Sequence, residues 1–466
     1  MNALQELERL LGNAVTADED VVEGYRRDTA SWAAAGVPLA LARPQDTEQV
    51  QALARWATQH RVPLVARGAG TGVAGGANAV EGCVIVSFER MNAIVELNEA
   101  AMYAVVEPGV LNGALKRAAQ ERGLWYSPDP SSYEISTIGG NVATNAGGLC
   151  CVKYGVTGDY VLGVEAVLAS GERFHTGGRC RKDVAGYDLK RLLVGSEGSL
   201  ALITQIRLRL RRRPLPPSTL VALFDTLEAA GDAAAGIVRS LEPSLLELMD
   251  RTALRAVESH ARLGIDHDAA AMLIGQSDSG NAADLELMSD ACKNAGASLV
   301  YVTEDEAEGQ LLLRARRLAY PALEQLGAVV IDDISVPLPR LSEMLRRIEL
   351  LAAEQGVLVA TVAHAGDGNI HPLIVFEPGD PGSRARAYAV FERLMLDALE
   401  LGGTVSGEHG IGTLKADFLG RQLDATSLQL HYAVKRAFDP LGLLNPGKLL
   451  SLAPPLPSSL GREPRA

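Results

Sequence analysis

Ser136-Thr-Ile-Gly-Gly-Asn-Val-Ala-Thr-Asn-Ala-Gly-Gly148 is the stretch of sequence that decides the fold. Its glycines carry no side chain, so the backbone there can lie close against a flat ligand. A second glycine-rich stretch, Ala66 to Gly76, precedes it, and a third, Gly195-Ser-Glu-Gly198, follows it. Turns alone are a poor explanation for three such loops in one part of a chain. One large, extended ligand that bears phosphate groups explains them together.

The first of these loops satisfies the pattern G-x-G-x-x-G through Gly70, Gly72 and Gly75. A dinucleotide-binding fold of the Rossmann type needs a helix between such glycines and the next strand. Residues 75–82 offer no helix of useful length, so that fold is not predicted. We prefer a loop whose backbone N–H groups converge on a pyrophosphate, with Arg67 as a counter-charge. A loop built only for tight packing is the alternative.

Composition bounds the class of protein. A chain of 466 residues is too long for one ordinary core, so two or three domains are expected. Hydrophobic residues make up 47% and charged residues 22%, a balance typical of a folded, soluble enzyme. The net charge of −13 argues against a nucleic-acid partner. The arginine-rich run 207–213 alternates with apolar residues, which predicts a strand with one solvated face.

Cysteine usage and the N-terminal residues indicate a cytoplasmic location. The five cysteines do not form a disulfide framework in a chain of this size, and none has C-x-x-C spacing. The first residues, MNALQELERLLG, show helical apolar spacing and acidic groups instead of the pattern of a secretory signal. No apolar run approaches the length of a membrane span. Peripheral association with a membrane stays open.

Strand and helix patterns alternate along the chain and predict an α+β fold. Residues 47–60 have helical periodicity between two short strand patterns, and residues 219–224 and 271–276 have strand patterns further on. The proline cluster at 211–217 is the best domain boundary, because its prolines cannot continue a central strand.

A second pair of motifs predicts a metal site. His364 and His371 flank the turn-forming sequence Gly-Asp-Gly-Asn, which can fold the chain back so that both imidazoles reach one ion. Glu408, in Ser406-Gly-Glu-His-Gly410, could supply an oxygen ligand, and His409 is free to act as a base. Neutral imidazoles with a carboxylate and one open position suit a catalytic divalent metal. We expect Zn²⁺ first, with Mn²⁺ and Fe²⁺ as alternatives.

Taken together, these motifs resemble a known family. The segments 67–72, 136–148, 195–199 and 445–448 are similar to the FAD-binding elements of the vanillyl-alcohol oxidase type flavoproteins. With HAGDGNIH and GEHG added, the chain resembles the branch of FAD-linked D-lactate, glycolate and D-2-hydroxyglutarate dehydrogenases. The resemblance covers residues from roughly 20 to 450 and keeps the order of every motif. It implies non-covalent FAD, because no histidine occupies the first glycine-rich loop.

The resemblance also implies a domain organisation and a set of FAD contacts. We expect an N-terminal helical segment (1–38), a two-subdomain FAD-binding domain (39–213), an α+β substrate and metal domain (214–400), a small helical C-terminal segment that completes both sites (401–452) and a disordered tail (453–466). The expected FAD contacts are Arg67, Gly68, Ala69, Gly70, Thr71, Gly72, Pro128, Asp129, Ser136, Thr137, Gly139, Gly140, Asn141, Thr144, Asn145, Gly147, Glu197, Gly198, Ile203, Asn445 and Lys448.

If the reaction is the oxidation of a 2-hydroxy acid, the residues of HAGDGNIH, of GEHG and of the arginine-rich helix can each be given a role. A metal held by His364, His371 and Glu408 would lower the pKa of the substrate hydroxyl, and His409 would take its proton. Arg316 is the candidate for the substrate carboxylate, because a guanidinium offers bidentate geometry. Its neighbours Arg314 and Arg317 are assigned to a solvated helix face. Asn369 is either a hydrogen-bond donor to the substrate or the left-handed residue of the turn.

Substrate size depends on one further comparison with the family. Relatives that act on D-2-hydroxyglutarate have a basic residue just before a Ser-x-Pro segment. The corresponding residues here, Val330 to Pro337, include Asp332 and Asp333, which would repel a second carboxylate. We therefore expect a monocarboxylate, D-lactate or glycolate, with D-2-hydroxyglutarate as the alternative.

Two other functions and several properties stay open at this stage. A non-catalytic FAD-binding subunit of a respiratory complex is one alternative, although both histidine motifs are present. An oxidase that reduces O₂ directly is another. The sequence leaves open a homodimer, and the electron acceptor could be a quinone, a cytochrome, an electron-transfer flavoprotein or an iron–sulfur partner subunit.

Overall fold

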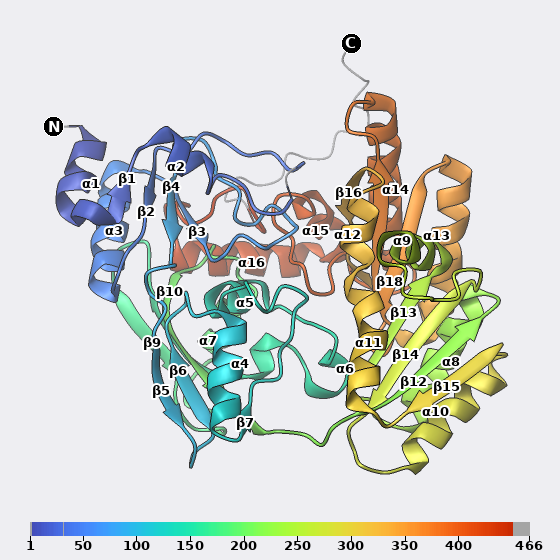
Figure 1. Ribbon diagram of the computed structural model, residues 1–466. Helices are drawn as coiled ribbons and strands as arrows, with labels where there is room; N and C mark the ends of the chain where they lie inside the picture. The colour runs from blue at the N-terminus through green and yellow to red at the C-terminus, as the bar shows by residue number, and fades with distance from the viewer. Residues whose placement is uncertain (1, 31, 451–466) are drawn as a thin grey trace.

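The computed structural model describes residues 2–30 and 32–450, so the tail expected at 453–466 lies outside the described residues. Within the described part of the chain the strands form four sheets. Figure 1 shows an N-terminal half, coloured blue to green, beside a second half in green, yellow and orange. The C-terminal helix α16 (Ala425–Phe438) crosses back to the first half.

A small, mainly parallel sheet begins the first half. It contains, in spatial order, β1 (Val15–Thr16), β2 (Ala40–Ala42), β4 (Val84–Ser87) and β3 (Leu64–Arg67). The strands β2, β4 and β3 run parallel, and α3 (Thr47–His60) connects β2 to β3. The chain passes from β3 to β4 through loops and turns. The structure therefore confirms that the G-x-G-x-x-G pattern does not begin a Rossmann helix.

An antiparallel sheet of five strands completes the first half. Its spatial order is β5 (Ile94–Asn98), β6 (Tyr103–Val106), β10 (Leu202–Arg209), β8 (Val161–Val167) and β9 (Arg173–Gly177). In β10, Ile206 and Leu208 are buried while Arg207 and Arg209 are half-buried, as the alternating pattern predicts. The next strand, β11 (Arg211–Arg212), pairs with β7 (Leu124–Trp125) and ends the half at the proline cluster.

The helices of the first half include one that the glycine-rich sequence conceals. They are α1 (Ala3–Leu11), α2 (Glu19–Glu23), α3, α4 (Asn112–Glu121), α5 (Ile138–Thr144), α6 (Cys151–Tyr154) and α7 (Leu189–Leu193). We expected an extended loop over residues 136–148, but α5 occupies its middle. The Thr137 side chain accepts a hydrogen bond from Gly140 N, and Asn145 ends the helix at a φ of 53°. These two caps allow a short helix despite Gly139 and Gly140.

A large antiparallel sheet organises the second half. Its path is β15 (Leu299–Thr303), β12 (Ser218–Phe224), β14 (Ala271–Ser277), β13 (Leu245–Asp250), β18 (Leu358–His364), β19 (Asn369–Phe376) and β16 (Ala328–Ile331), with β17 (Ile334–Ser335) also paired to β19. Strands β13, β14 and β19 are buried along their whole length, because helices cover both faces of the sheet.

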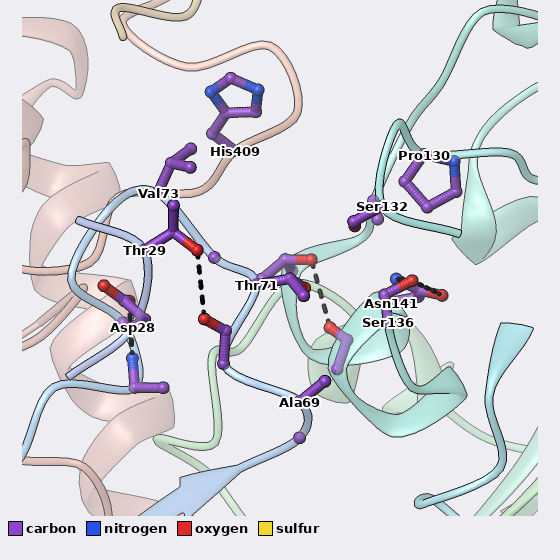
Figure 2. A pocket seen from close by; sticks show the side chains of 18 of the residues that line it. Asp28, Thr29, Ala69, Thr71, Val73, Pro130, Ser132, Ser136, Asn141 and His409 are labelled. Carbon is purple, nitrogen blue, oxygen red and sulfur yellow. Dashed lines mark hydrogen bonds between the residues drawn. The ribbon is translucent and has the colours of Figure 1, made fainter. Parts of the chain in front are cut away.

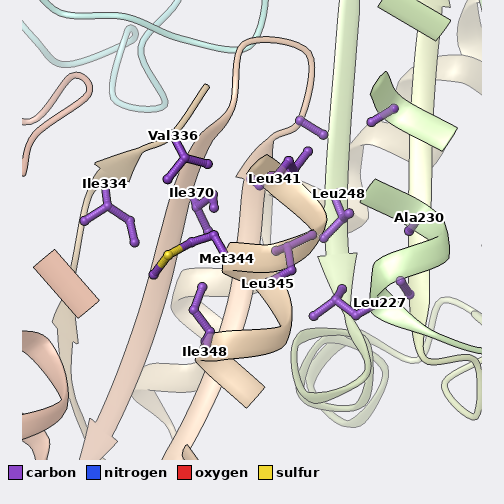
Figure 3. Close-up of a cluster of buried hydrophobic side chains, with 14 of the residues drawn as sticks. Leu227, Ala230, Leu248, Ile334, Val336, Leu341, Met344, Leu345, Ile348 and Ile370 are labelled. Atoms are coloured by element: carbon purple, nitrogen blue, oxygen red, sulfur yellow. The ribbon is translucent and has the colours of Figure 1, made fainter. Parts of the chain in front are cut away.

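The helices of the second half form two layers. One layer consists of α8 (Leu227–Ser240), α10 (Ala283–Asn294), α13 (Leu341–Gln355) and α14 (Pro381–Glu400). Figure 3 shows Met344, Leu345 and Ile348 of α13 packed with Leu248 of β13 and Ile370 of β19. The other layer consists of α9 (Arg251–Ala261), α11 (Glu306–Arg317) and α12 (Ala319–Glu324). Helices α11 and α12 lie between the large sheet and the first half (Figure 1).

The C-terminal residues join the two halves. Leu64 of β3 donates its backbone N–H to Leu443 and accepts one from Asn445, so the chain end packs beside the first sheet. Val434 and Phe438 of α16 pack on the core of the five-stranded sheet. A short helix, α15 (Leu419–Gln422), precedes α16. Residues 405–415, which include Glu408 and His409, contact both halves, because Gly412 N donates to Glu197 Oε2 and Glu408 N donates to Asp333 Oδ2.

Candidate active site

A cavity of about 640 Å³ lies where the two halves meet. Most of the predicted cofactor residues line it: Arg67, Gly68, Ala69, Gly70, Thr71, Gly72, Ser136, Thr137, Gly139, Gly140, Asn141, Thr144, Gly147, Glu197, Gly198 and Ile203. The same cavity is also lined by Arg316, His371, Glu408 and His409. Figure 2 shows His409 on a separate loop, across the cavity from Ala69 and Ser136. The fold therefore brings the glycine-rich loops and the second set of motifs to one site.

At two glycines in this wall, another segment lies so close to the backbone that a Cβ atom would collide with it. A Cβ at Gly68 would collide with Thr137 Oγ1, so the hydroxyl that caps α5 would have to shift. A Cβ at Gly147 would collide with Glu408 Oε2 and would lie 3.2 Å from Glu408 Cβ. The end of the second stretch thus touches the predicted metal ligand directly. A cavity of this volume with such bare backbone in its wall fits a flat, phosphate-bearing cofactor.

Five predicted cofactor residues lie outside the cavity wall: Pro128, Asp129, Asn145, Asn445 and Lys448. Two of them secure loops from behind. Asn445 Nδ2 donates to the backbone oxygen of Glu197 at 2.6 Å, and Lys448 Nζ donates to Asn445 Oδ1 at 2.8 Å and to the Asn78 carbonyl. Burial lowers the pKa of Lys448 to about 8. Both residues hold the loops around Glu197 and Asn78, and their direct contact with the cofactor stays a prediction.

Of the other three, Asn145 and Asp129 form hydrogen bonds at the end of the second glycine-rich stretch, and the Pro128 carbonyl accepts from Asn112 Nδ2 at 3.2 Å. Asn145 Oδ1 accepts from Gly158 N at 2.8 Å, and Asp129 Oδ1 accepts from Cys150 N at 3.3 Å. The residues that follow Pro128 and Asp129 face the cavity instead, and they are Pro130, Ser131 and Ser132. The sequence SPDPSS indicates that this segment belongs to the cofactor site. It does not indicate which of its residues face the cavity. Asp28 and Thr29 also line the cavity and were missed, because nothing in their sequence distinguishes them.

The two histidines of HAGDGNIH meet because their strands form a hairpin. His364 ends β18 and pairs with Asn369, and Val362 pairs with His371 on β19. His364 and His371 therefore lie diagonally on one face of the sheet. Their ring centroids are 5.0 Å apart. Gly368, with a φ of 76°, is the left-handed residue of the turn, so Asn369 does not have that role.

The three predicted metal ligands converge. Glu408 Oε1 lies 3.3 Å from His364 Nε2 and 3.3 Å from His371 Nε2. In a tetrahedral site with bonds of about 2.1 Å, ligand atoms lie roughly 3.4 Å apart, which matches this spacing. His409 Nε2 is 3.6 Å from the same oxygen, and its ring stacks on His371 with centroids 4.8 Å apart. The donor set and its spacing fit a divalent metal.

Burial and charge set the protonation of this cluster. Burial lowers the pKa of His371 to about 4, so its imidazole is neutral and able to bind a metal. Burial also opposes the charged form of His409, but Asp333 and Glu408 outweigh it and raise the His409 pKa. The neighbouring histidines, His364 foremost, outweigh burial and hold the pKa of Glu408 well below its ordinary value.

Asp333 fixes the loop that carries Glu408 and His409. Its Oδ2 accepts from Ser406 Oγ at 2.7 Å, Glu408 N at 3.0 Å and His409 N at 2.8 Å. Its side chain is fully buried, and it does not line the cavity. Opposite charges on His409 and other neighbours outweigh burial and lower the pKa of Asp333, which keeps the carboxylate ionised. Sequence reasoning did not find this role.

The expected acidic wall beside the substrate is therefore wrong. Asp332, like Asp333, is fully buried, and its Oδ1 lies 2.9 Å from Lys415 Nζ. Ile331 is the residue of this segment that lines the cavity. The chain leaves β16 after Ile331, and the two aspartates that follow it turn into the protein interior.

The structure separates the two other predicted catalytic residues. Arg316 lines the main cavity from the last turn of α11, and its Nε donates to Glu247 Oε2 at 2.8 Å. Asn369 lines a smaller cavity of about 200 Å³ with His364. Its Nδ2 donates to Asp333 Oδ1 at 2.8 Å and to the Ile334 carbonyl at 3.0 Å. Both amide hydrogens are used, so a donor role towards substrate needs correction.

The neighbours of Arg316 differ from each other. Arg314 is exposed on α11, as expected for a solvated face. Arg317 is exposed too, but it lines the rim of the main cavity.

Comparisons with known proteins agree with this arrangement. A family model described as an FAD binding domain matches residues 38–177, and one described as FAD linked oxidases, C-terminal domain, matches residues 214–449. The glycolate oxidase subunit GlcD of Bacillus subtilis (strain 168) is 39% identical over 420 residues, which cover 89% of each chain. The D-lactate dehydrogenase of Archaeoglobus fulgidus is 35% identical over 415 residues, covering 88% of this chain and 90% of the relative.

Solved structures show the same fold at lower identity. p-Cresol methylhydroxylase with substrate bound superposes with a TM-score of 0.82 at 19% identity, covering 97% of each chain. A 4-ethylphenol oxidase from Gulosibacter chungangensis gives a TM-score of 0.78 at 20% identity, again over 97% of each chain. The fold is thus the α+β fold of vanillyl-alcohol oxidase type flavoproteins.

The fold and the site define an FAD-dependent oxidoreductase. Within that class, the chain belongs to the FAD-linked oxidases, in the family of FAD-linked D-2-hydroxy acid dehydrogenases. Among residues 2–30 and 32–450, no helix is both long and apolar enough to cross a membrane.

Proposed function

We propose that this protein oxidises a small D-2-hydroxy acid, D-lactate or glycolate, to the 2-oxo acid. The observation that carries the proposal is the single cavity that joins the glycine-rich loops to Arg316, His371, Glu408 and His409. A hydride acceptor, a carboxylate partner and a base are the parts that this oxidation requires. The names of the relatives, glycolate oxidase subunit and D-lactate dehydrogenase, support the substrate class.

The residues divide the work between binding and proton transfer. Arg316 pairs with the substrate carboxylate and orients the carbon that bears the hydroxyl. His409 takes the hydroxyl proton, and Asp333 and Glu408 stabilise the resulting imidazolium. FAD, held non-covalently by the glycine-rich loops, supplies the acceptor for the hydride that leaves the same carbon. A divalent metal, Zn²⁺ first, would be held by His364, His371 and Glu408 and would supply a Lewis acid that lowers the hydroxyl pKa.

The apolar wall of the cavity, and not an acidic one, is the basis for proposing a monocarboxylate substrate. Ile331, Val362, Leu373 and Tyr320 line the substrate side of the cavity. A second carboxylate placed against these apolar side chains would lose water without gaining a partner. Arg317 at the rim is the feature that favours a dicarboxylate instead, so D-2-hydroxyglutarate is the competing substrate.

The relatives named as subunits support a separate electron acceptor. We propose that the reduced cofactor passes its electrons to a partner of one of the four kinds named above. Reoxidation in air, compared with reoxidation by an artificial acceptor, separates a dehydrogenase from an oxidase.

Steady-state oxidation with an artificial acceptor tests the substrate proposal. The panel contains D- and L-lactate, glycolate and both enantiomers of 2-hydroxyglutarate. We expect the highest kcat/KM with D-lactate or glycolate. A higher kcat/KM with D-2-hydroxyglutarate would overturn the assignment of substrate size, and no turnover with any of them would overturn the function.

A further inference from the structure

Glu247 is a carboxylate in the centre of the large sheet. It lies in β13, a strand whose six residues are all buried, and its side chain is fully inaccessible to solvent. An ionised carboxylate in such surroundings costs several kcal/mol unless partners compensate it. The strand LLELMD would be a better sheet core with an apolar residue at this position. Glu247 therefore needs an explanation beyond packing.

One oxygen of Glu247 contacts a predicted metal ligand. Strand pairing places Glu247 opposite His364, and Oε1 lies 2.5 Å from His364 Nδ1. With Nδ1–H donated to the carboxylate, Nε2 is the nitrogen left for a ligand, and it is this atom that lies near Glu408 Oε1. A carboxylate in this position selects the tautomer and the orientation of a metal-binding imidazole.

The other oxygen contacts the predicted substrate arginine. Arg316 Nε donates to Glu247 Oε2 at 2.8 Å. Because Nε is engaged, the two Nη groups are the donors that Arg316 can offer to the cavity that it lines. An arginine on a helix has several rotatable bonds, and a charge-assisted bond to a buried acceptor fixes its planar fork.

We propose that Glu247 is a positioning residue that aligns the substrate-binding guanidinium of Arg316 with the metal-binding imidazole of His364. This role rests on the proposed function, since it gives both partners their tasks. One buried carboxylate fixes the positions of both side chains. The carboxylate and the hydroxyl of the substrate therefore bind to two groups, Arg316 and the metal at His364, that lie at a fixed separation. Loss of Glu247 is then expected to disturb metal binding and acid binding together.

Glu247→Gln is the discriminating variant, because an amide can satisfy only one partner. If its oxygen faces Arg316 Nε, its NH₂ faces His364 Nδ1 and reverses the tautomer, which places a hydrogen on Nε2. If its oxygen faces His364, two donors confront each other at Arg316. Asp250→Asn is the matched control. Asp250 is a buried carboxylate in the same strand that accepts from Ala253 N and Thr361 N, away from the cavity.

Two binding measurements that need no turnover test the proposal. Zn²⁺ affinity is measured by competition with a chromophoric chelator. Binding of oxalate, an unreactive acid, is measured from the change in flavin absorbance of the FAD-loaded protein. For Glu247→Gln we expect Zn²⁺ affinity to fall about 10–100-fold and oxalate affinity to fall about tenfold, as expected for a misaligned charged bond. Asp250→Asn, with a similar loss of thermal stability, keeps both affinities.

Two results would overturn the proposal. One is wild-type affinity for both Zn²⁺ and oxalate in Glu247→Gln, which would make Glu247 structural. The other is an equal loss in both variants. Failure of the proposed function gives a result distinct from these two. The flavin of the wild-type protein would then resist reduction by every 2-hydroxy acid, while the affinities for Zn²⁺ and oxalate could still be compared between the variants.

Discussion

Replacing Asp333 by asparagine removes a charge from the centre of the site without changing the shape of the side chain. Oδ1 accepts from Asn369 Nδ2 at 2.8 Å, and Oδ2 accepts from Ser406 Oγ, Glu408 N and His409 N at 2.7, 3.0 and 2.8 Å. The least costly orientation places the new NH₂ at the Oδ1 position. One short bond, from Asn369, is then lost there together with the longer second contact of Glu408 N at 3.3 Å, and the other three become bonds to a neutral acceptor.

The magnitude follows from these contacts. A charge-assisted hydrogen bond contributes about 1.5–3 kcal/mol and a neutral one about 1 kcal/mol, so losing one and weakening three costs roughly 4 kcal/mol. Since the weakened bonds hold Glu408 and His409, we expect the midpoint of thermal unfolding to fall and bound Zn²⁺ to be lost. Metal analysis after dialysis and a thermal melt measure the two effects.

Asp332→Asn is the control for this prediction. It weakens another buried ion pair, with Lys415, but leaves the backbone of Glu408 and His409 bonded to Asp333. We expect a loss of stability with Zn²⁺ retained. Equal metal loss in the two variants, or full metal retention in Asp333→Asn, would refute the reasoning.

Three further predictions follow from single contacts. Gly147→Ala should reduce bound metal at least tenfold, because its Cβ would displace Glu408. Gly178→Ala, with open space around its Cβ, should leave bound metal unchanged, and equal metal contents in the two variants would contradict this prediction. Ile331→Lys should raise kcat/KM for D-2-hydroxyglutarate relative to D-lactate at least tenfold by pairing the second carboxylate, and an unchanged ratio would count against the apolar wall. Thr137→Ala removes the N-cap of α5, worth about 1 kcal/mol, so the Kd of FAD measured by flavin fluorescence should rise about fivefold; an unchanged Kd would show that this cap does not support the FAD site.

Residue type and spacing were enough to predict much of the site. Each glycine-rich stretch combines bare backbone with turn chemistry, and the histidines flank a turn, so local sequence contains the information. The hairpin that brings His364 to His371 follows from the Gly-Asp-Gly-Asn sequence between two strand patterns. The helix α5 was missed because its glycines disfavour helix, and two caps outweigh them in the fold.

Contacts between distant segments could not be predicted. Glu247 precedes His364 by 117 residues, and only strand pairing in the large sheet brings them together. Its one local signal is an acidic residue inside an apolar strand. Asp332 and Asp333 show the opposite error, because the sequence predicted acidic groups beside the substrate while the fold buries both. Such residues reveal their roles only when register and burial are known.

Anaerobic bleaching of the flavin by D-lactate, before and after removal of the metal by a chelator, tests the central claim most directly. The claim is that one cavity combines an FAD site with a metal site that acts on the same substrate. We expect rapid bleaching of the untreated protein, loss of bleaching in protein that keeps its FAD but not its metal, and recovery on addition of Zn²⁺. Bleaching at an unchanged rate in the metal-free protein would contradict the account.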